Sequence, residues 1–312
     1  MSSSRRSPPT ERVVGLLDHL VAHSGERFGL SELARAVELS KPTCLGILTT
    51  LTELGWVTCD GPSRTYGIGP ALVAAGRLAR QAVPGADAAE RELAALAVRY
   101  RCACSASAVV GDEIVVLTSV RADGRPEGTL AGARYPFVPP VGLMYVLWDG
   151  DEAVERWLSR RPAVPVTLDR PHLRRIVTEC RQRGYLVEGL TEVGARLHRL
   201  MAGVAAYDLP DEVRGLVGEM VSTLGERVYL EDELTPRGKH QTHLLAAPTY
   251  GSDGRQQLVL TMYVGQAITG AEIARRGRAL TATATAVTEA VERDRGQGRT
   301  GSGRPPGRKA SA

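Results

Sequence analysis

The chain has 312 residues, 43% of them hydrophobic and 24% charged, which is enough for two packed domains. No apolar run reaches 18 residues and the first residues lack an apolar signal core, so we expect a cytoplasmic protein rather than a membrane-spanning or secreted one. The formal net charge is +4, and the five cysteines have no disulfide-framework spacing, so we expect reduced thiols that lie mostly in the core.

The first part of the chain has the pattern of three helices followed by a β-hairpin. Apolar residues recur at helical spacing in residues 11–24, 31–39 and 41–54, and Ser31 and Ser40 are the expected N-caps. Residues 56–69 then have the pattern of strand, turn and strand. This order is typical of a winged helix-turn-helix over residues 10–70, and the alternative is a generic three-helix bundle with a hairpin.

The third helix is the expected DNA-reading helix, although it carries no arginine or asparagine for a bidentate contact to a base. Threonine hydroxyls can contact phosphates, and threonine methyls and Leu45 can contact thymine methyl groups. Gly46 costs about 1 kcal/mol of helix stability relative to alanine, which indicates close approach of a DNA phosphate or of a neighbouring helix. The candidate DNA-contacting residues lie on the first and third helices and in the hairpin turn: Arg12, Lys41, Thr43, Leu45, Gly46, Thr49, Thr50 and Arg64.

The remainder of the chain predicts an α+β domain over residues 85–294, preceded by a linker helix over 71–84. We expect strands where the apolar period is two and helices where it is 3.6. The expected strands are 102–110, 113–121, 128–137, 241–250 and 256–265, and the expected helices are 87–101, one starting at Pro140, 151–160, 169–184, 208–224 and 270–294. Residues 1–9 and the basic, Gly/Ser/Pro-rich tail 295–312 are expected to be disordered; the tail either attracts DNA weakly or has no task.

Other candidate sites have ordinary interpretations. His240 and His243 would point to opposite faces of a strand, so we expect no metal site. Cys102 and Cys104 would share a face, which favours a core or pocket-lining role over redox sensing. The acidic run 229–234 is expected to be solvated. Because no catalytic motif or phosphate loop is present, we expect neither an enzyme nor a cofactor.

The chain resembles the IclR-type transcription regulators over roughly residues 11–291. The resemblance rests on LSELARAVELSKPTCLGILTTLTELGWV and RTYGIGPAL in the first part, and on GARYPFVPPVGLMYVLW, RQRGYLVE and LLAAPTYGSDG in the second. It implies a GAF-like effector-binding domain, and dimers formed through the N-terminal and linker regions, often paired into tetramers.

Three departures from the family pattern bear on DNA and ligand specificity. Leu45 and Gly46 stand where members often have a polar or aromatic residue and then an arginine. Residues 140–143, PVGL, replace an Ala-rich turn that ends in Gly-Lys, and residues 189–242 form a longer connection whose pattern predicts two extra helices. The ligand is therefore expected to differ from the small aromatic and organic acids typical of the family.

We therefore predict a ligand-responsive regulator, by default a repressor, whose homodimer or tetramer binds double-stranded operator DNA and a small-molecule effector. The alternative is a small-molecule-binding or enzymatic domain whose winged helix serves only dimerisation. The effector pocket is expected between the sheet and the helix starting at Pro140, although its residues would otherwise fill the core. The candidate pocket residues are Cys104, Ala106, Leu117, Gly142, Tyr145, Ala246, Met262 and Tyr263.

Overall fold

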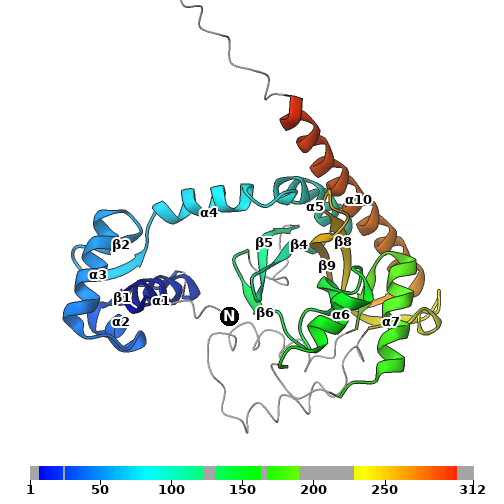
Figure 1. Ribbon diagram of the computed structural model, residues 1–312, viewed down its shortest axis with the longest axis horizontal. Coiled ribbons are helices and arrows are strands. Elements are labelled where there is room, and N and C mark those ends of the chain that lie inside the picture. The colour runs from blue at the N-terminus through cyan, green and yellow to red at the C-terminus, as the bar shows by residue number, and fades with distance from the viewer. Residues whose placement is uncertain (1–6, 24, 123–130, 163–166, 190–227, 301–312) are drawn as a thin grey trace, which may run out of the picture. The chain divides into compact units, whose positions relative to one another are not determined.

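The computed structural model describes residues 7–23, 25–122, 131–162, 167–189 and 228–300, and the side chains up to residue 293 (Figure 1). The chain divides into two compact units, Met1–Ala82 and Val83–Ala312. The predicted helix 208–224, the two predicted extra helices and residues 301–312 of the predicted tail lie outside the described residues.

The first unit has the predicted order of three helices and a hairpin. Its elements are α1 (Pro8–Ala22), β1 (Phe28–Gly29), α2 (Leu30–Ala36), α3 (Lys41–Glu53), β2 (Val57–Asp60), β3 (Thr65–Ile68) and the linker helix α4 (Ala71–Gln81). The strands form an antiparallel sheet in the order β1-β3-β2, in which the short strand β1 was not predicted. Buried leucines of α1, α2 and α3 and Val57 of β2 form the core of this unit.

The helix ends of the first unit are decided by local hydrogen bonds. Ser40 caps α3 as predicted, because its hydroxyl accepts a hydrogen bond from the Thr43 backbone N–H at 3.3 Å. The prediction for Ser31 was wrong: α2 starts at Leu30 and its N-cap is Gly29, two residues before Ser31. The Gly29 N–H donates to Glu32 Oε2 at 2.7 Å. Helix α1 begins at Pro8, inside the segment predicted to be disordered.

The second unit is a six-stranded antiparallel sheet with helices on both faces. The elements before residue 190 are α5 (Ala86–Tyr100), β4 (Ala103–Val110), β5 (Glu113–Arg121), β6 (Arg134–Pro136), the 3₁₀ turn η1 (Leu143–Tyr145), α6 (Asp151–Leu158), α7 (Arg170–Arg183) and β7 (Leu186–Glu188). The later elements are η2 (Glu231–Glu233), β8 (Lys239–Tyr250), β9 (Gln256–Thr269) and α10 (Gly270–Thr300). The strand order is β6-β5-β4-β9-β8-β7, which confirms both predicted hairpins and the α+β class.

Each face of this sheet packs against its own helices and forms its own core (Figure 1). On one face, side chains of β4, β8 and β9 pack on α5 and α10. On the other face, side chains of β5, β8 and β9 pack on η1, α6 and α7. Because successive strand residues point to opposite faces, neighbours in sequence belong to different cores.

Three predicted elements of the second unit were wrong in extent. The helix expected from Pro140 is only the single turn η1, since Gly142 before it has φ 114° and packs against Phe137 and Trp157. Of the strand predicted for 128–137, residues 128–130 lie outside the described residues, and within 131–137 the strand is Arg134–Pro136, which pairs with β5. Helix α10 continues to Thr300, six residues into the predicted disordered tail. The predicted end of α7 at Gly184 is confirmed, and its φ of 78° is a left-handed cap.

Candidate functional site

The outer face of α3 does not pack against the rest of the first unit. Cys44, Leu48 and Leu51 hold the opposite face of the helix in the core. All eight predicted DNA-contacting residues are exposed: Arg12 on α1, Arg64 in the hairpin turn, and the other six on α3. The helix therefore presents these six side chains to a partner outside its own unit.

Gly46 lies in the open on this face. A Cβ atom built on Gly46 would meet no heavy atom within 4 Å. Of the two causes that we considered for a glycine here, packing against a neighbouring helix of the described chain is therefore ruled out. Close approach of DNA stays as a prediction.

The hairpin of β2 and β3 is held to the rest of the first unit by Arg27. Its guanidinium donates four hydrogen bonds, to the hydroxyl and carbonyl oxygens of Thr58 and of Thr65, at 2.9 to 3.3 Å. At the tip of the hairpin, Asp60 accepts hydrogen bonds from the backbone and hydroxyl of Ser63, which lower the pKa of its carboxyl group. Exposed Arg64 follows in a left-handed conformation, φ 50°. The hairpin is thus a braced wing, and sequence analysis missed the bracing role of Arg27.

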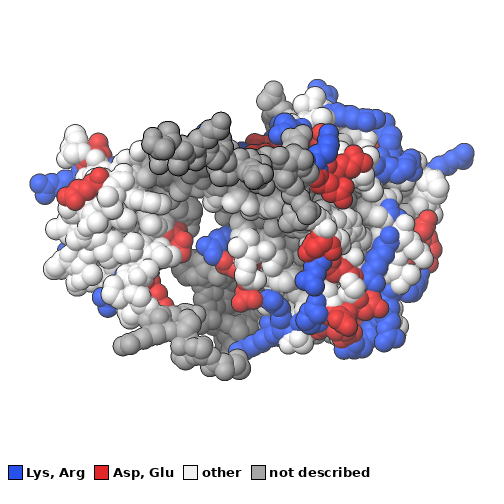
Figure 2. All heavy atoms as spheres, turned by 45° about the horizontal axis from the view of Figure 1, so that its top comes forward, with Lys and Arg blue, Asp and Glu red and all other residues white. Residues whose placement is uncertain are grey.

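Charge does not gather into one large basic surface on the face seen in Figure 2. Lys and Arg side chains are interspersed with Asp and Glu over the second unit, and the first unit shows few charged side chains on this face. This agrees with nine Lys and Arg against seven Asp and Glu in residues 1–80. The affinity of this unit for DNA would thus depend on its shape and on individual residues more than on a positive surface potential.

The eight predicted pocket residues do not line one cavity, because the sheet separates them. Cys104, Ala106 and Met262 lie in the core under α5 and α10, and Leu117 packs against that core. Ala246 lies in the core under α6 and α7, Tyr145 and Tyr263 pack against it, and Gly142 contacts Phe137 on that side. The prediction of a common pocket was wrong in placing both sets on one face.

A cluster of hydroxyl groups lies on the face under η1. We call it the hydroxyl cluster and define it as Ser105, Ser107, Tyr145 and Tyr263. The Ser107 and Tyr145 hydroxyl oxygens are 2.5 Å apart, and those of Ser105 and Tyr263 are 3.3 Å apart. Sequence analysis missed both serines, although the run CACSASAVV alternates small apolar residues with serine and so already separates the two faces.

The phenol of Tyr145 is a neutral hydrogen-bonding group. Burial raises the pKa of Tyr145 above the ordinary value for tyrosine, and the hydrogen bond with Ser107 opposes this only in part. The phenol therefore keeps its proton at neutral pH and serves as a donor or acceptor rather than as a base.

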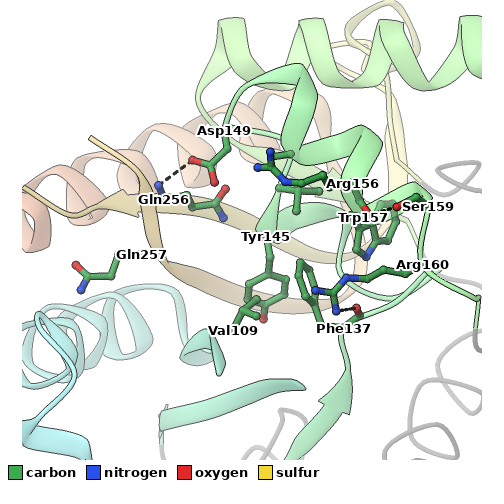
Figure 3. Close-up of a pocket in the computed structure, with 12 residues that line it drawn as sticks. Val109, Phe137, Tyr145, Asp149, Arg156, Trp157, Ser159, Arg160, Gln256 and Gln257 are labelled. Carbon is green, nitrogen blue, oxygen red and sulfur yellow. Dashed lines mark hydrogen bonds between the residues drawn. The ribbon is translucent and has the colours of Figure 1, made fainter. Parts of the chain in front are cut away.

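Beside Tyr145, a cavity of about 500 Å³ opens between η1, α6 and the start of β9 (Figure 3). Phe137, Trp157 and Val109 supply its apolar wall. The Arg160 guanidinium lies 4.8 Å from the centre of the Phe137 ring and forms an ion pair with Asp112 at 2.9 Å. This size and this mixture of aromatic and polar walls are typical of a small-molecule site.

The other end of the cavity has polar groups that sequence analysis missed (Figure 3). The Gln256 backbone N–H donates to Asp149 at 2.9 Å, and the Gln256 side-chain amide donates to the Met144 carbonyl at 2.7 Å. The Oε1 atoms of Gln256 and Gln257 are buried and accept no hydrogen bond from the described residues. Both side chains line the cavity, so each oxygen is an unsatisfied acceptor in its wall.

The cysteines and histidines add no second site in the described part of the chain. Cys44, Cys102, Cys104 and Cys180 are buried and Cys59 is exposed, all as free thiols. The Cys102 and Cys104 sulfur atoms are 3.8 Å apart, and the hydrogen bond with Cys102, together with burial, raises the pKa of Cys104. Within the described ranges, no three His, Cys, Asp or Glu side chains meet as metal ligands, and no helix has the length and apolarity needed to span a membrane.

Comparisons with known proteins agree on one family. Residues 9–61 match the IclR helix-turn-helix domain, whereas no curated protein matches the chain. An IclR transcriptional regulator from Alicyclobacillus acidocaldarius matches at 21% identity and a TM-score of 0.63, over 92% of this chain and 100% of that one. The IclR of Thermotoga maritima matches at 16% identity and a TM-score of 0.61, over 90% and 98%.

A third solved structure was determined with a ligand. An IclR homologue from Microbacterium hydrocarbonoxydans, complexed with 4-hydroxybenzoate, matches at 17% identity and a TM-score of 0.56, over 91% of this chain and 99% of that one. At these identities the likeness shows the fold.

The first unit is therefore an IclR helix-turn-helix domain, of the class of DNA-binding transcription regulators. The chain as a whole has the fold of the solved IclR regulators to which it is similar.

Proposed function

We propose that this protein is a ligand-responsive repressor, acting in the cytoplasm, whose homodimer binds operator DNA and releases it when a small organic effector binds the second unit. The observation that carries the proposal is the outer face of α3. It is exposed, capped by Ser40 and followed by a braced wing, in a unit that matches a DNA-binding family. In this geometry α3 enters the major groove and Arg64 reaches the adjacent backbone or minor groove.

The linker helix α4 supports the proposed dimer. None of its residues is buried, and the side chains of Val73 and Leu78 are 75% and 60% exposed. Apolar side chains exposed along one helix suit contact with a second copy of the chain. A two-fold dimer would present two copies of α3 to half-sites one helical turn apart.

The hydroxyl cluster and the adjoining cavity are the proposed effector site. An apolar part of the effector would lie against Phe137 and Trp157. Its N–H or O–H groups would donate to the unpartnered Oε1 atoms of Gln256 and Gln257. The effector releases DNA only if it binds the DNA-free arrangement more tightly than the DNA-bound one.

The first test is DNA binding by the full chain across a salt series, with the DNA upstream of its own gene and a scrambled duplex. We expect tight, selective binding with a steep salt slope. Equal, weak binding to both duplexes, lost at physiological salt, would contradict the proposal and leave only attraction between basic residues and phosphate.

The effector site is tested by screening small organic molecules for release of the bound DNA. For an active molecule, we expect Gln256→Leu to raise the concentration that releases DNA by about tenfold, because each unsatisfied polar group costs about 1–3 kcal/mol. Binding of DNA without the effector should be unchanged. The matched control is Gln266→Leu, since Gln266 is an exposed glutamine on the same strand β9 and does not line the cavity.

A further inference from the structure

The outer face of α3 carries few polar groups that could form hydrogen bonds with a DNA base. Its exposed residues are Lys41, Pro42, Thr43, Leu45, Gly46, Thr49, Thr50 and Glu53. The two charged groups stand at opposite ends of the helix, and 44% of the Leu45 side chain is exposed between them. Between Lys41 and Glu53, only the threonine hydroxyls can form polar contacts with a base.

Those hydroxyls already have partners inside the helix. Thr49 Oγ1 donates to the Leu45 carbonyl at 2.9 Å, and Thr50 Oγ1 donates to the Gly46 carbonyl at 3.1 Å. The Thr43 hydroxyl lies 2.8 Å from that of Ser40 at the N-cap. A hydroxyl group has one proton to donate, so Thr49 and Thr50 have none left for a base. Each hydroxyl oxygen can still accept a hydrogen bond from the amino group of adenine or cytosine, and each side chain keeps its Cγ2 methyl group for apolar contact.

The major groove presents distinct groups for each base pair. Guanine is read by donors to its O6 and N7 atoms. On the outer face of α3 the charged donor is Lys41, and the Thr43 hydroxyl at the same end shares a hydrogen bond with Ser40 in which either oxygen can donate. Thymine presents a methyl group at C5, which apolar side chains contact. Leu45 and the methyl of Thr49 lie one helical turn apart beside the open Cα of Gly46, and they match that group.

On these grounds, and resting on the proposed DNA-binding function, we propose that α3 recognises its operator through the C5 methyl groups of thymine. Leu45 and the Thr49 methyl group make these contacts, and Lys41 and Arg64 contribute affinity for phosphate without sequence information. The ligand class is therefore a duplex with thymines at fixed positions in each half-site.

The test on the DNA side replaces thymine with deoxyuridine, which removes only the methyl group. A duplex is first selected from a randomised pool by the full chain, and each thymine in the protected half-site is then replaced singly. We expect a loss of about fourfold in affinity at each contacted position, the equivalent of about 0.8 kcal/mol for one buried methyl group. Replacement outside the protected region is the control and should change nothing.

The test on the protein side separates the methyl group of Thr49 from its hydroxyl. Thr49→Val keeps the methyl and removes the hydroxyl, and we expect it to bind as tightly as the unsubstituted chain. Thr49→Ser keeps the hydroxyl and removes the methyl, and should lose about fourfold with no change in salt slope. Thr285→Ser is the matched control, because the Thr285 hydroxyl donates to the Thr281 carbonyl of α10 in the same way.

The two tests are combined in a double-substitution cycle. At a thymine that Thr49 contacts, deoxyuridine should cost the unsubstituted chain about fourfold and cost Thr49→Ser almost nothing, because the contact is already lost. Selective binding that deoxyuridine leaves unchanged, or that Thr49→Val abolishes, would overturn the inference while leaving the proposed function intact. If the unsubstituted chain selects no sequence, both the inference and the proposed function fail.

Discussion

Replacing Gly46 with alanine should make α3 more stable. Gly46 lies in the interior of this 13-residue helix, and a built Cβ atom would meet nothing within 4 Å. Alanine is therefore accepted without a clash and brings the intrinsic helix advantage of about 1 kcal/mol. For a unit of this size, 1 kcal/mol corresponds to about 4–8 °C in the midpoint of thermal unfolding.

Thermal unfolding of the full chain, followed by circular dichroism and by hydrogen exchange in α3, measures this change. Gly15→Ala is the matched control, because Gly15 lies inside α1 and a Cβ built there also meets nothing within 4 Å. Both variants should be stabilised by similar amounts. A lower midpoint for Gly46→Ala, together with a higher midpoint for Gly15→Ala, would refute the argument that the Gly46 position is open.

The same pair of variants tests why glycine is present at this position. If DNA approaches the Cα atom of Gly46 closely, an added methyl group overpacks the contact and costs about 1–3 kcal/mol of binding. We expect selective DNA affinity to fall by about tenfold for Gly46→Ala and to be unchanged for Gly15→Ala. Undiminished affinity in a stabilised Gly46→Ala variant would show that the DNA does not approach closely there.

Three further substitutions test other contacts of the fold. Gly69→Ala places a Cβ atom 2.2 Å from a backbone carbonyl oxygen, so we expect a loss of about 3 kcal/mol in urea unfolding; unchanged stability would show that the two segments separate easily. Arg27→Ala removes four exposed hydrogen bonds and should cost about 1 kcal/mol, with faster hydrogen exchange in β2 and β3 but not in α10. Hydrogen bonds from Arg275 and then Arg276 lower the pKa of Glu272, and partial burial opposes them. The ionised Glu272 therefore contributes its full stabilisation of the folded chain above the ordinary pKa of glutamate. This contribution is lost as the pH falls through the depressed folded pKa. Glu272→Gln should therefore destabilise the chain at pH 7 and lose this effect as the pH falls through the depressed folded pKa of Glu272, and an equal effect at neutral and at strongly acidic pH would contradict this.

The sequence by itself determined the elements whose cause is local. Ser40 beside an apolar 3.6-residue period is sufficient for α3, because an N-cap acts over three residues and amphipathicity over one helix. Gly184 ends α7, and Gly111 turns the hairpin of β4 and β5, because only the left-handed backbone is required there. The period of two in β4 likewise places Cys104 and Ser105 on opposite faces of the strand.

Only the tertiary structure decided which residues pack against each face of the sheet. Periodicity shows that Cys104 and Ser105 point to opposite faces of the sheet. It does not show that α5 and α10 cover the face of Cys104, or that Tyr145 and Tyr263 lie on the face of Ser105. These contacts join residues 38 to 158 positions apart, and they depend on which helix packs on which side of the sheet. The same holds for the turn at Gly142, whose apolar neighbours predict a helix, whereas its packing against Phe137 and Trp157 sets the backbone.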